Sequence, residues 1–160
     1  MNINKNKLKN IGVQAIVEGI LESDEQGCSL ISAINLSSNL LTSDCLRQFA
    51  RLSDPSFIQL NSLNLSYNDL GQDSILTLQP ILSEITELNL ASTKLSNKSL
   101  VDLVGTFKKQ EMKLQTLDIH SNLITTEGFY KLMVCLKANN KVKKLNISHN
   151  KIANDLKMFR

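Results

Sequence analysis

An eleven-residue pattern recurs along the chain, and it constrains the possible folds more than any other feature of the sequence. Leu, Ile or Val fills its first, fourth, sixth and eleventh positions, and Asn usually fills its ninth. Complete copies begin at Ile31, Leu60, Ile85, Leu114 and Val142, so neighbouring starts lie 29, 25, 29 and 28 residues apart. A partial copy precedes them, with Ile3, Asn6 and Leu8 at its sixth, ninth and eleventh positions.

Each copy predicts a short β-strand, and the stretch that follows predicts a helix. Apolar residues at the fourth and sixth positions alternate by two, as on one face of a strand. The intervening stretches have a helical period instead, with apolar residues at Gly12, Ala15, Ile16, Val17 and Ile20, at Ile75, Leu78, Ile81 and Leu82, at Leu100, Leu103, Val104 and Phe107, and at Leu132, Met133, Cys135 and Leu136. The side chains expected to cap these helices are Thr42, Ser43, Asp44, Asp73, Ser96, Thr125, Thr126 and Glu127.

A strand followed by a helix, repeated along the chain, predicts an α/β solenoid with one parallel sheet and helices on one side of it. No single repeat can bury its own apolar face, so the repeats must stack. We expect a single domain, residues 1–160, that begins and ends in mid-repeat and holds about five to six repeats. Strands only about 4.8 Å apart should make the sheet face concave and the helix face convex.

The repeats resemble those of leucine-rich-repeat proteins. Their shared pattern L-x-x-L-x-L-x-x-N-x-L and their spacing are similar to the ribonuclease-inhibitor-like subclass. The resemblance implies a horseshoe arc that binds other proteins and is not an enzyme. Ribonuclease inhibitors and the GTPase-activating proteins for Ran have similar repeats, which leaves regulation of an enzyme as an alternative. Arg47 and Arg51 share one helical segment, but no residue matches the functional positions of those families.

A column of asparagines at the ninth position predicts a structural ladder. The column consists of Asn6, Asn39, Asn68, Asn122 and Asn150, with Thr93 as the replacement in one copy. A row of amides could bind a polar ligand, but buried amides must be hydrogen-bonded, and the backbone of the turn after each strand offers the partners. We therefore expect the amides to be structural, with fewer bonds at Thr93.

The sheet face is the first candidate for partner binding. Its fifth and seventh positions are expected to point outward, and they carry small polar residues and no arginine. Strong interfaces favour Trp, Tyr and Arg anchors, so this surface predicts a weak or shape-driven contact at most. The candidate residues are Asn35, Asn64, Tyr67, Asn89, Asp118, His120 and His149.

Asp118, His120 and His149 form the only grouping that suggests metal or catalytic chemistry. Asp118 and His120 share a strand face, and His149 falls on the next strand. A metal needs at least three converging donors, and the cysteines lie in other segments. We expect no catalytic site, no metal and no cofactor.

Two further surfaces are candidates. Leu76, Val101 and Tyr130 occupy one repeat position on adjacent helices and predict an apolar row on the helix face, if that position faces solvent. Residues 83–160 carry thirteen basic and seven acidic side chains, and the basic end includes Lys141, Lys143, Lys144 and Lys151. This end could meet an acidic partner, but lysine predominates without interleaved aromatics, which argues against nucleic-acid binding.

Composition excludes several classes of protein. Apolar residues make up 42% and charged residues 21% of the 160, which is typical of a globular domain. No run is long and apolar enough to span a membrane, and no secretory signal is visible. Cys28, Cys45 and Cys135 are an odd set without CxxC spacing, which argues against disulfides and a zinc site and favours a cytoplasmic protein, in a cytoskeletal or ciliary assembly. Cys45 and Cys135 fall on apolar repeat positions, so we expect them to be packed as small thiols, whereas Cys28 lies in a polar connection and is expected to be exposed.

The two ends of the chain lack the polar capping repeats that normally close a solenoid. Unpaired strand edges tend to associate, so we expect a fragment of a longer solenoid or ends covered by partner chains. Leu156, Met158 and Phe159 are expected to fold back over the last repeat. The predicted function is a scaffold or adaptor that binds proteins.

Overall fold

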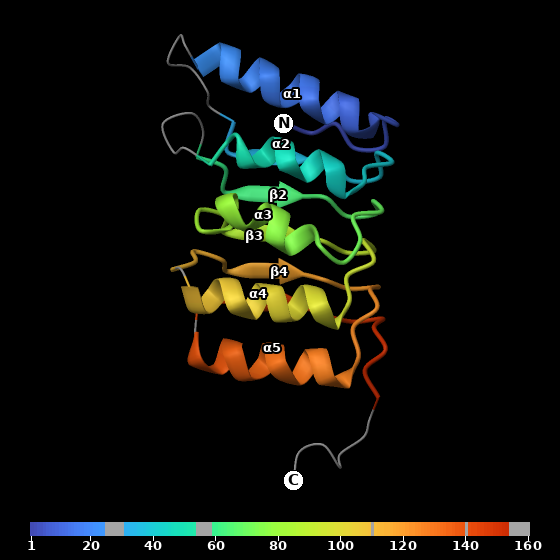
Figure 1. Ribbon diagram of the computed structural model, residues 1–160, viewed down its shortest axis with the longest axis vertical. Coiled ribbons are helices and arrows are strands. Elements are labelled where there is room, and N and C mark those ends of the chain that lie inside the picture. Colours follow the sequence, from blue (N-terminus) through green and yellow to red (C-terminus); the bar gives the residue numbers. More distant parts are fainter. Residues whose placement is uncertain (25–30, 54–58, 110, 140, 154–160) are drawn as a thin grey trace.

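A computed structural model describes residues 1–24, 31–53, 59–109, 111–139 and 141–153 as two stacked layers (Figure 1). One layer is a parallel sheet in sequence order, and the other is a row of helices that covers one face of it. The strands are β1 (Ala33–Asn35), β2 (Ser62–Asn64), β3 (Glu87–Asn89), β4 (Thr116–Asp118) and β5 (Lys144–Asn146). They occupy the third to fifth positions of the complete copies, as the alternation predicts.

The strands pair in the register that the repeats predict. Leu63 pairs with Leu88, which pairs in turn with Leu117, so the fourth positions form one continuous column. The unequal spacing of the copies therefore changes the connections and not the sheet. The α/β repeat solenoid predicted from the sequence is confirmed.

Helices of different lengths connect the strands. They are α1 (Lys9–Asp24), α2 (Leu46–Ala50, preceded by a 3-10 turn at Ser43–Cys45), α3 (Ser74–Leu82), α4 (Asn97–Lys109) and α5 (Thr126–Ala138). The copy that spans only 25 residues carries the nine-residue α3, whereas α4 and α5 have 13 residues each. Pro80 lies inside α3 and has no N–H to donate to the preceding turn.

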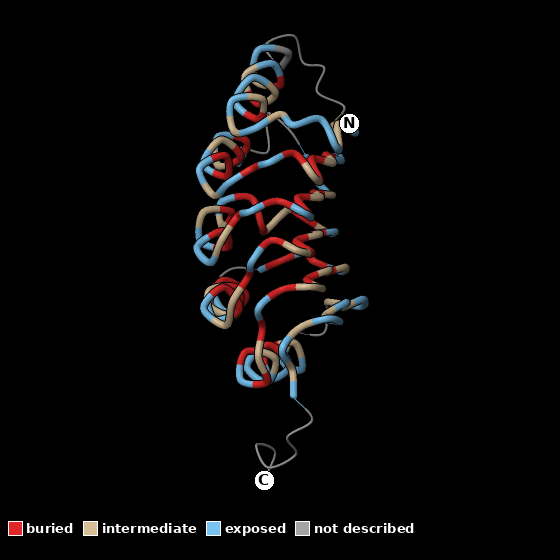
Figure 2. Tube along the Cα trace, turned by 90° about the vertical axis from the view of Figure 1, so that its right-hand side faces the viewer, coloured by how far each residue is buried: buried red, intermediate tan, exposed pale blue. Residues whose placement is uncertain are grey.

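The core lies between the layers and runs the length of the stack (Figure 2). Leu65, Leu90 and Ile119, all at the sixth position, have no exposed surface, and each stabilises the fold by about 1.5–3 kcal/mol on burial. The helical period was wrong at two places: Ala15 and Met133 are exposed, while Val13 is buried. In these helices the buried stripe is narrower than the apolar pattern.

Two of the three cysteines are packed in the core as free thiols, as predicted. Cys45 is 1% exposed, and its burial raises the pKa of the thiol to about 12, with the nearby Asp44 carboxylate adding to the rise. Burial also raises the pKa of Cys135, which is 8% exposed, although the Lys108 ammonium opposes that rise. Cys28 lies outside the described residues.

The asparagine ladder is confirmed, and Asn122 exemplifies it. Its Oδ1 accepts hydrogen bonds from the backbone N–H groups of Thr93 and Leu95 in the preceding repeat, at 3.0 and 2.9 Å. Its Nδ2 donates to backbone oxygens of both repeats, those of Leu90, Ile119 and His120. Asn68 and Asn39 make the same sets of contacts two and three repeats earlier.

We call the bonds between one ninth-position side chain and the preceding turn a rung of the ladder. The rung at Thr93 is incomplete, as the sequence predicts. Its hydroxyl donates only to the Leu90 carbonyl of its own turn, at 2.7 Å. At Asn39, Asn68 and Asn122 the amide oxygen accepts from two N–H groups of the preceding turn. Here those groups belong to Asn68 and Leu70, and neither N–H has a hydrogen-bond partner among the described residues.

The predicted helix caps are wrong. Thr42, Asp73 and Thr125 make no side-chain capping bond, and the Ser96 hydroxyl is buried without a partner among the described residues. Instead, an asparagine of the preceding repeat holds the entry to the helix. Asn97 Oδ1 accepts from the Thr125 N–H at 2.9 Å, and its Nδ2 donates to the Thr125 hydroxyl at 2.8 Å. Asn10 binds Thr42 in the same way.

In the turn after each strand, the residue at the eighth position of the pattern has a left-handed backbone conformation. These residues are Lys5, Ser38, Tyr67, Ser92, Ser121 and His149, with φ between 53° and 57°. This conformation costs residues other than glycine about 1–2 kcal/mol, and the ladder holds the backbone in it.

The first residues of the chain extend the sheet. Asn2 forms a parallel bridge with Asn35, and the Ile3 and Lys5 N–H groups donate to the carbonyls of Asn35 and Ser37. The predicted cap of Leu156, Met158 and Phe159 lies outside the described residues. No helix in the described part of the chain has both the length and the hydropathy to cross a bilayer.

Candidate functional site

The fifth-position asparagines of the sheet face each use their side-chain oxygen for a local hydrogen bond to the backbone. In Asn35, Asn64 and Asn89, Oδ1 accepts from the backbone N–H two residues later, at 3.1, 3.0 and 3.0 Å. This local bond is typical of Asn followed two positions later by a turn residue. The oxygen is thus occupied, and the NH2 group is left for other contacts.

Those NH2 groups form a row of hydrogen-bond donors across β1, β2 and β3. The register places Asn35 beside Asn64 and Asn64 beside Asn89, and all three residues are half-buried. Their Nδ2 atoms have no hydrogen-bond partner among the described residues. A hollow of about 230 Å³ lies over β2, β3 and β4, lined in part by Asn64, Asn89 and Asp118.

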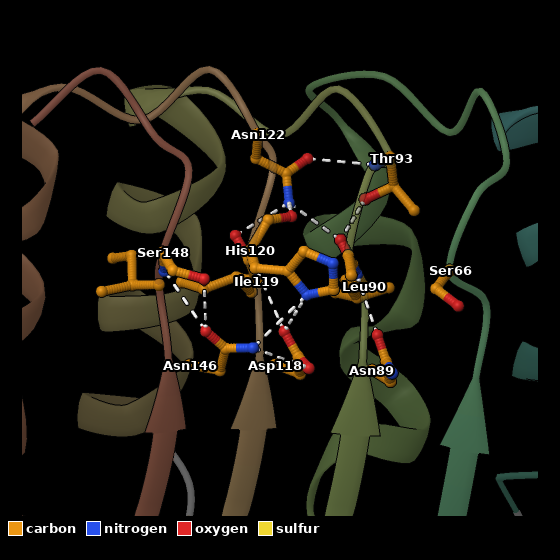
Figure 3. A network of polar contacts seen from close by, with 12 residues as sticks. Ser66, Asn89, Leu90, Thr93, Asp118, Ile119, His120, Asn122, Asn146 and Ser148 are labelled. Atoms are coloured by element: carbon orange, nitrogen blue, oxygen red, sulfur yellow. Dashed lines mark hydrogen bonds and ion pairs between the residues drawn. The ribbon is translucent and has the colours of Figure 1, made fainter.

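At the end of this row, a cluster of Tyr67, Asp118, His120 and Asn146 has a carboxylate in place of the donor amide. Figure 3 shows Asp118, His120 and Asn146 of this cluster. Asp118 Oδ1 lies 2.7 Å from His120 Nδ1 and also accepts from the His120 N–H. Asn146 Nδ2 donates to Asp118 Oδ2 at 3.2 Å. The Tyr67 ring meets the imidazole edge to face, with centroids 6.3 Å apart. The cluster thus offers charged, polar and aromatic contacts together.

His149 does not join this cluster, although the sequence suggested that it would lie near Asp118 and His120. It is exposed in the turn after β5, at the left-handed eighth position, and Asn146 occupies the neighbouring fifth position instead. Among the described residues, no three His, Cys, Asp or Glu side chains are placed to hold a metal ion.

The seventh positions were predicted to point outward, and at three strands this is wrong. Ser37, Ser66 and Ala91 are 8%, 3% and 0% exposed. The strands end at the fifth position, so the seventh already lies in the turn, where the following left-handed residue bends the chain. Only His120 and Ser148 keep accessible seventh positions on the later strands.

An apolar feature beside the sheet face escaped sequence analysis. Leu40 is 60% exposed and Tyr67 57%, and both line a hollow of about 480 Å³ at the turns, together with Asp69 and Lys94. The tenth position of the pattern faces solvent in every copy. An apolar residue at that position, such as Leu40, could therefore have indicated this hollow from the sequence.

The apolar row predicted on the helix face is accessible. Leu76, Val101 and Tyr130 are 48%, 44% and 44% exposed. Val101 and Tyr130 also line a groove of about 760 Å³ between α4 and α5, but Leu76 on α3 does not.

The lysines of the basic end do not form one patch. Lys141 and Lys143 precede β5, Lys144 begins it, and Lys151 follows the turn at the other end of the strand. Lys141 pairs with Glu111, and Lys143 reaches Gln115 Oε1 at 3.5 Å.

Comparisons with known proteins agree with the geometry. The family model described as "Leucine Rich repeat" matches residues 138–155, around β5. The mouse protein "NACHT, LRR and PYD domains-containing protein 4C" is 26% identical over 125 residues, which cover 77% of this chain and 13% of that protein. Both matches support the presence of leucine-rich repeats in this chain.

Leucine-rich repeats indicate a protein-interaction module. The repeats also explain three Asn-x-Ser triplets that look like glycosylation signals, those at Asn35, Asn64 and Asn146. In each, the Asn oxygen accepts from the serine N–H, so the triplet forms a turn at the end of a strand.

Proposed function

We propose that the chain is a scaffold or adaptor module that holds a partner protein on its sheet face. The observation that carries the proposal is the row of donors from Asn35, Asn64 and Asn89. Such donors suit the carbonyl oxygens of an extended segment or loop, and the Tyr67 ring and the exposed Leu40 supply apolar contact area at one edge. The sparse anchors favour a weak, exchangeable complex.

The finer assignments are part of the same proposal. The repeat spacing supports the ribonuclease-inhibitor-like subclass, with about five to six repeats in a horseshoe arc. The buried free thiols of Cys45 and Cys135 support a reducing compartment, hence a cytoplasmic assembly, cytoskeletal or ciliary.

The test replaces donors without disturbing the turns. In the double variant Asn64→Asp and Asn89→Asp, each side chain keeps an oxygen for the backbone N–H but loses its NH2 group. Asp118 already occupies this column in the same way and accepts from His120. The variant should therefore fold. It should bind a sheet-face partner at least about tenfold more weakly, because each substitution removes a hydrogen-bond donor and places a carboxylate against the partner's carbonyl oxygen, at a cost of over about 1 kcal/mol.

A photo-crosslinking amino acid at Tyr67 identifies the partner in extracts of the source cell, and the same amino acid at Arg47 on α2 is the control. Gln72→Glu, in the exposed loop before α3, is the matched amide-to-acid control for binding. A partner captured equally from Arg47, or bound equally by the double variant, would contradict the sheet-face proposal. Stimulated GTP hydrolysis or nuclease inhibition by the purified protein would favour an enzyme regulator instead.

A further inference from the structure

The groove between α4 and α5 lies on the opposite layer from the sheet face and has the form of a binding site. The two 13-residue helices follow parallel strands and run side by side (Figure 1), over a length of about 20 Å. The groove has a volume of about 760 Å³ and is lined by Val101, Val104, Phe107, Tyr130 and Val134. Met112 and Cys135 also line it and are buried.

The walls of the groove are unusually apolar for an accessible surface. Val134 is 54% exposed, and Val101 and Tyr130 are 44% exposed each, while Met133 beside them is 40% exposed. A contiguous patch of exposed apolar residues that is surrounded by polar residues marks an interaction site, whereas single scattered apolar residues do not. A concave apolar channel between two helices fits a third helix laid along it, with side chains at the i, i+3, i+4 and i+7 positions entering the channel.

The rim of the groove carries an excess of positive charge. Its lining includes Lys108, Lys131 and Lys141 but only one carboxylate, that of Glu111. Lys131 pairs with Glu127 at 2.6 Å, and Lys141 pairs with Glu111. In the part of the chain that the structure describes, Lys108, Lys109 and Lys137 have no carboxylate within 4 Å.

Lys108 on α4 and Cys135 on α5 both line the groove. The Lys108 ammonium also opposes the rise that burial causes in the pKa of Cys135. A charge held beside an apolar channel attracts an opposite charge on whatever occupies the channel.

We propose that the α4–α5 groove binds an amphipathic helix of a partner protein whose polar face is acidic. A second copy of this chain is a poorer occupant, because two such grooves face to face would bring their lysines together. An anionic bilayer is flat, and apolar residues recessed between two helices would not reach its interior. The acidic helix satisfies both the shape of the groove and its charge.

The test uses a display library of 16-residue peptides with leucines at helical spacing and either Glu or Lys at each polar position. Selection against the full chain should enrich Glu, and a fluorescein-labelled winner should bind with an affinity that falls several-fold between about 0.05 and 0.3 M salt. Val134→Asp places a negative charge in the channel at an exposed position and should weaken binding at least tenfold.

Matched variants make the outcome decisive. Leu76→Asp introduces the same charge at similar exposure on α3, outside the groove, and should leave binding unchanged. Lys108→Glu should reverse the preference from Glu-rich to Lys-rich peptides. The double variant Asn64→Asp and Asn89→Asp should bind the peptide normally, which separates this proposal from the one for the sheet face.

Several results would overturn the proposal. These are selection of lysine-rich or unpatterned peptides, equal loss of binding in Leu76→Asp, and no peptide binding up to millimolar concentration. Sedimentation of the chain with phosphatidylserine-containing vesicles that is lost in Val134→Asp would assign the groove to membranes. A concentration-dependent dimer that the same substitution dissociates would assign it to self-association.

Discussion

Asparagine has two separate structural roles in the repeats, and they differ in which of its side-chain atoms are bonded. At the ninth position the side chain is buried, and both its oxygen and its nitrogen bond the backbone, as for Asn122. At the fifth position only the oxygen is bonded locally, as for Asn64. The same residue type therefore holds the solenoid together at one position and leaves a donor accessible at the other.

Thr93→Asn should stabilise the protein by about 1–2 kcal/mol. The new amide oxygen would accept from the N–H groups of Asn68 and Leu70, which lack partners among the described residues, and each buried bond contributes about 0.5–1.5 kcal/mol. The volumes of the two side chains are similar, so the core need not move. Urea unfolding of the variant and the parent measures the difference.

Asn122→Thr is the matched reverse change for that experiment. It removes a complete rung and should cost a similar or larger free energy, because two buried N–H groups lose their acceptor. If Thr93→Asn leaves the stability unchanged or lowers it, the turn at Thr93 is not equivalent to the others and the ladder description fails there.

At the scale of elements, contacts between repeats hold the entries to α2 and α5. The Asn97 side chain, at the start of α4, bonds to Thr125, the residue just before α5. Gly128 in the first turn of α5 leaves room for this contact: a Cβ there would lie 2.9 Å from Asn97 Cγ. Helix entry therefore depends on the neighbouring repeat and not on a local capping residue.

Gly128→Ala should destabilise the protein by about 1–3 kcal/mol, because the added methyl group displaces Asn97 and breaks its bonds to Thr125. Gly105→Ala in α4 is the control, since a Cβ there meets nothing within 4 Å. The control should gain about 0.5–1 kcal/mol from helix propensity. Thermal unfolding of both variants measures the effects, and equal changes in the two would rule out this role for Gly128.

The same contacts explain what could be predicted from the sequence. The strands, their register and the ninth-position ladder follow from residues that recur at fixed positions, such as Leu63 and Asn68. The caps could not be predicted, because the Thr125 hydroxyl is bonded to a residue 28 positions away. Val101 and Tyr130 were found by their repeat position, but the groove depends on how α4 packs against α5, which no local pattern encodes.

At the scale of the whole molecule, the junction between the copies that begin at Leu60 and Ile85 differs from the others. It carries the incomplete rung at Thr93. It is also spanned by three exposed ion pairs: Lys94–Asp69 at 2.6 Å, Lys98–Asp73, and Lys113–Glu84 at 2.6 Å. Exposed pairs contribute about 0–1 kcal/mol each and weaken with salt. This junction therefore combines an incomplete rung with three salt-sensitive ion pairs.

Raising NaCl from about 0.05 to 1 M should loosen this junction selectively. Hydrogen exchange of the amides that cross it, those of Leu65, Tyr67 and Gly71, should accelerate more than that of Leu90 and Ser92, which cross the next junction. Mass spectrometry of peptic fragments measures the difference. Thr93→Asn should reduce it, and uniform acceleration along the stack would contradict the prediction.

The incomplete rung at Thr93 also matters when the chain is pulled. Repeats that contact only their neighbours bear tension in series, so extension concentrates at the weakest connection. With one buried amide missing and surface charges in its place, that connection lies between Asn68 and Thr93. A load applied to the two ends should therefore part the stack there first, at a force that depends on ionic strength. The missing amide at Thr93 and the surface ion pairs would thus set the force at which the repeats separate.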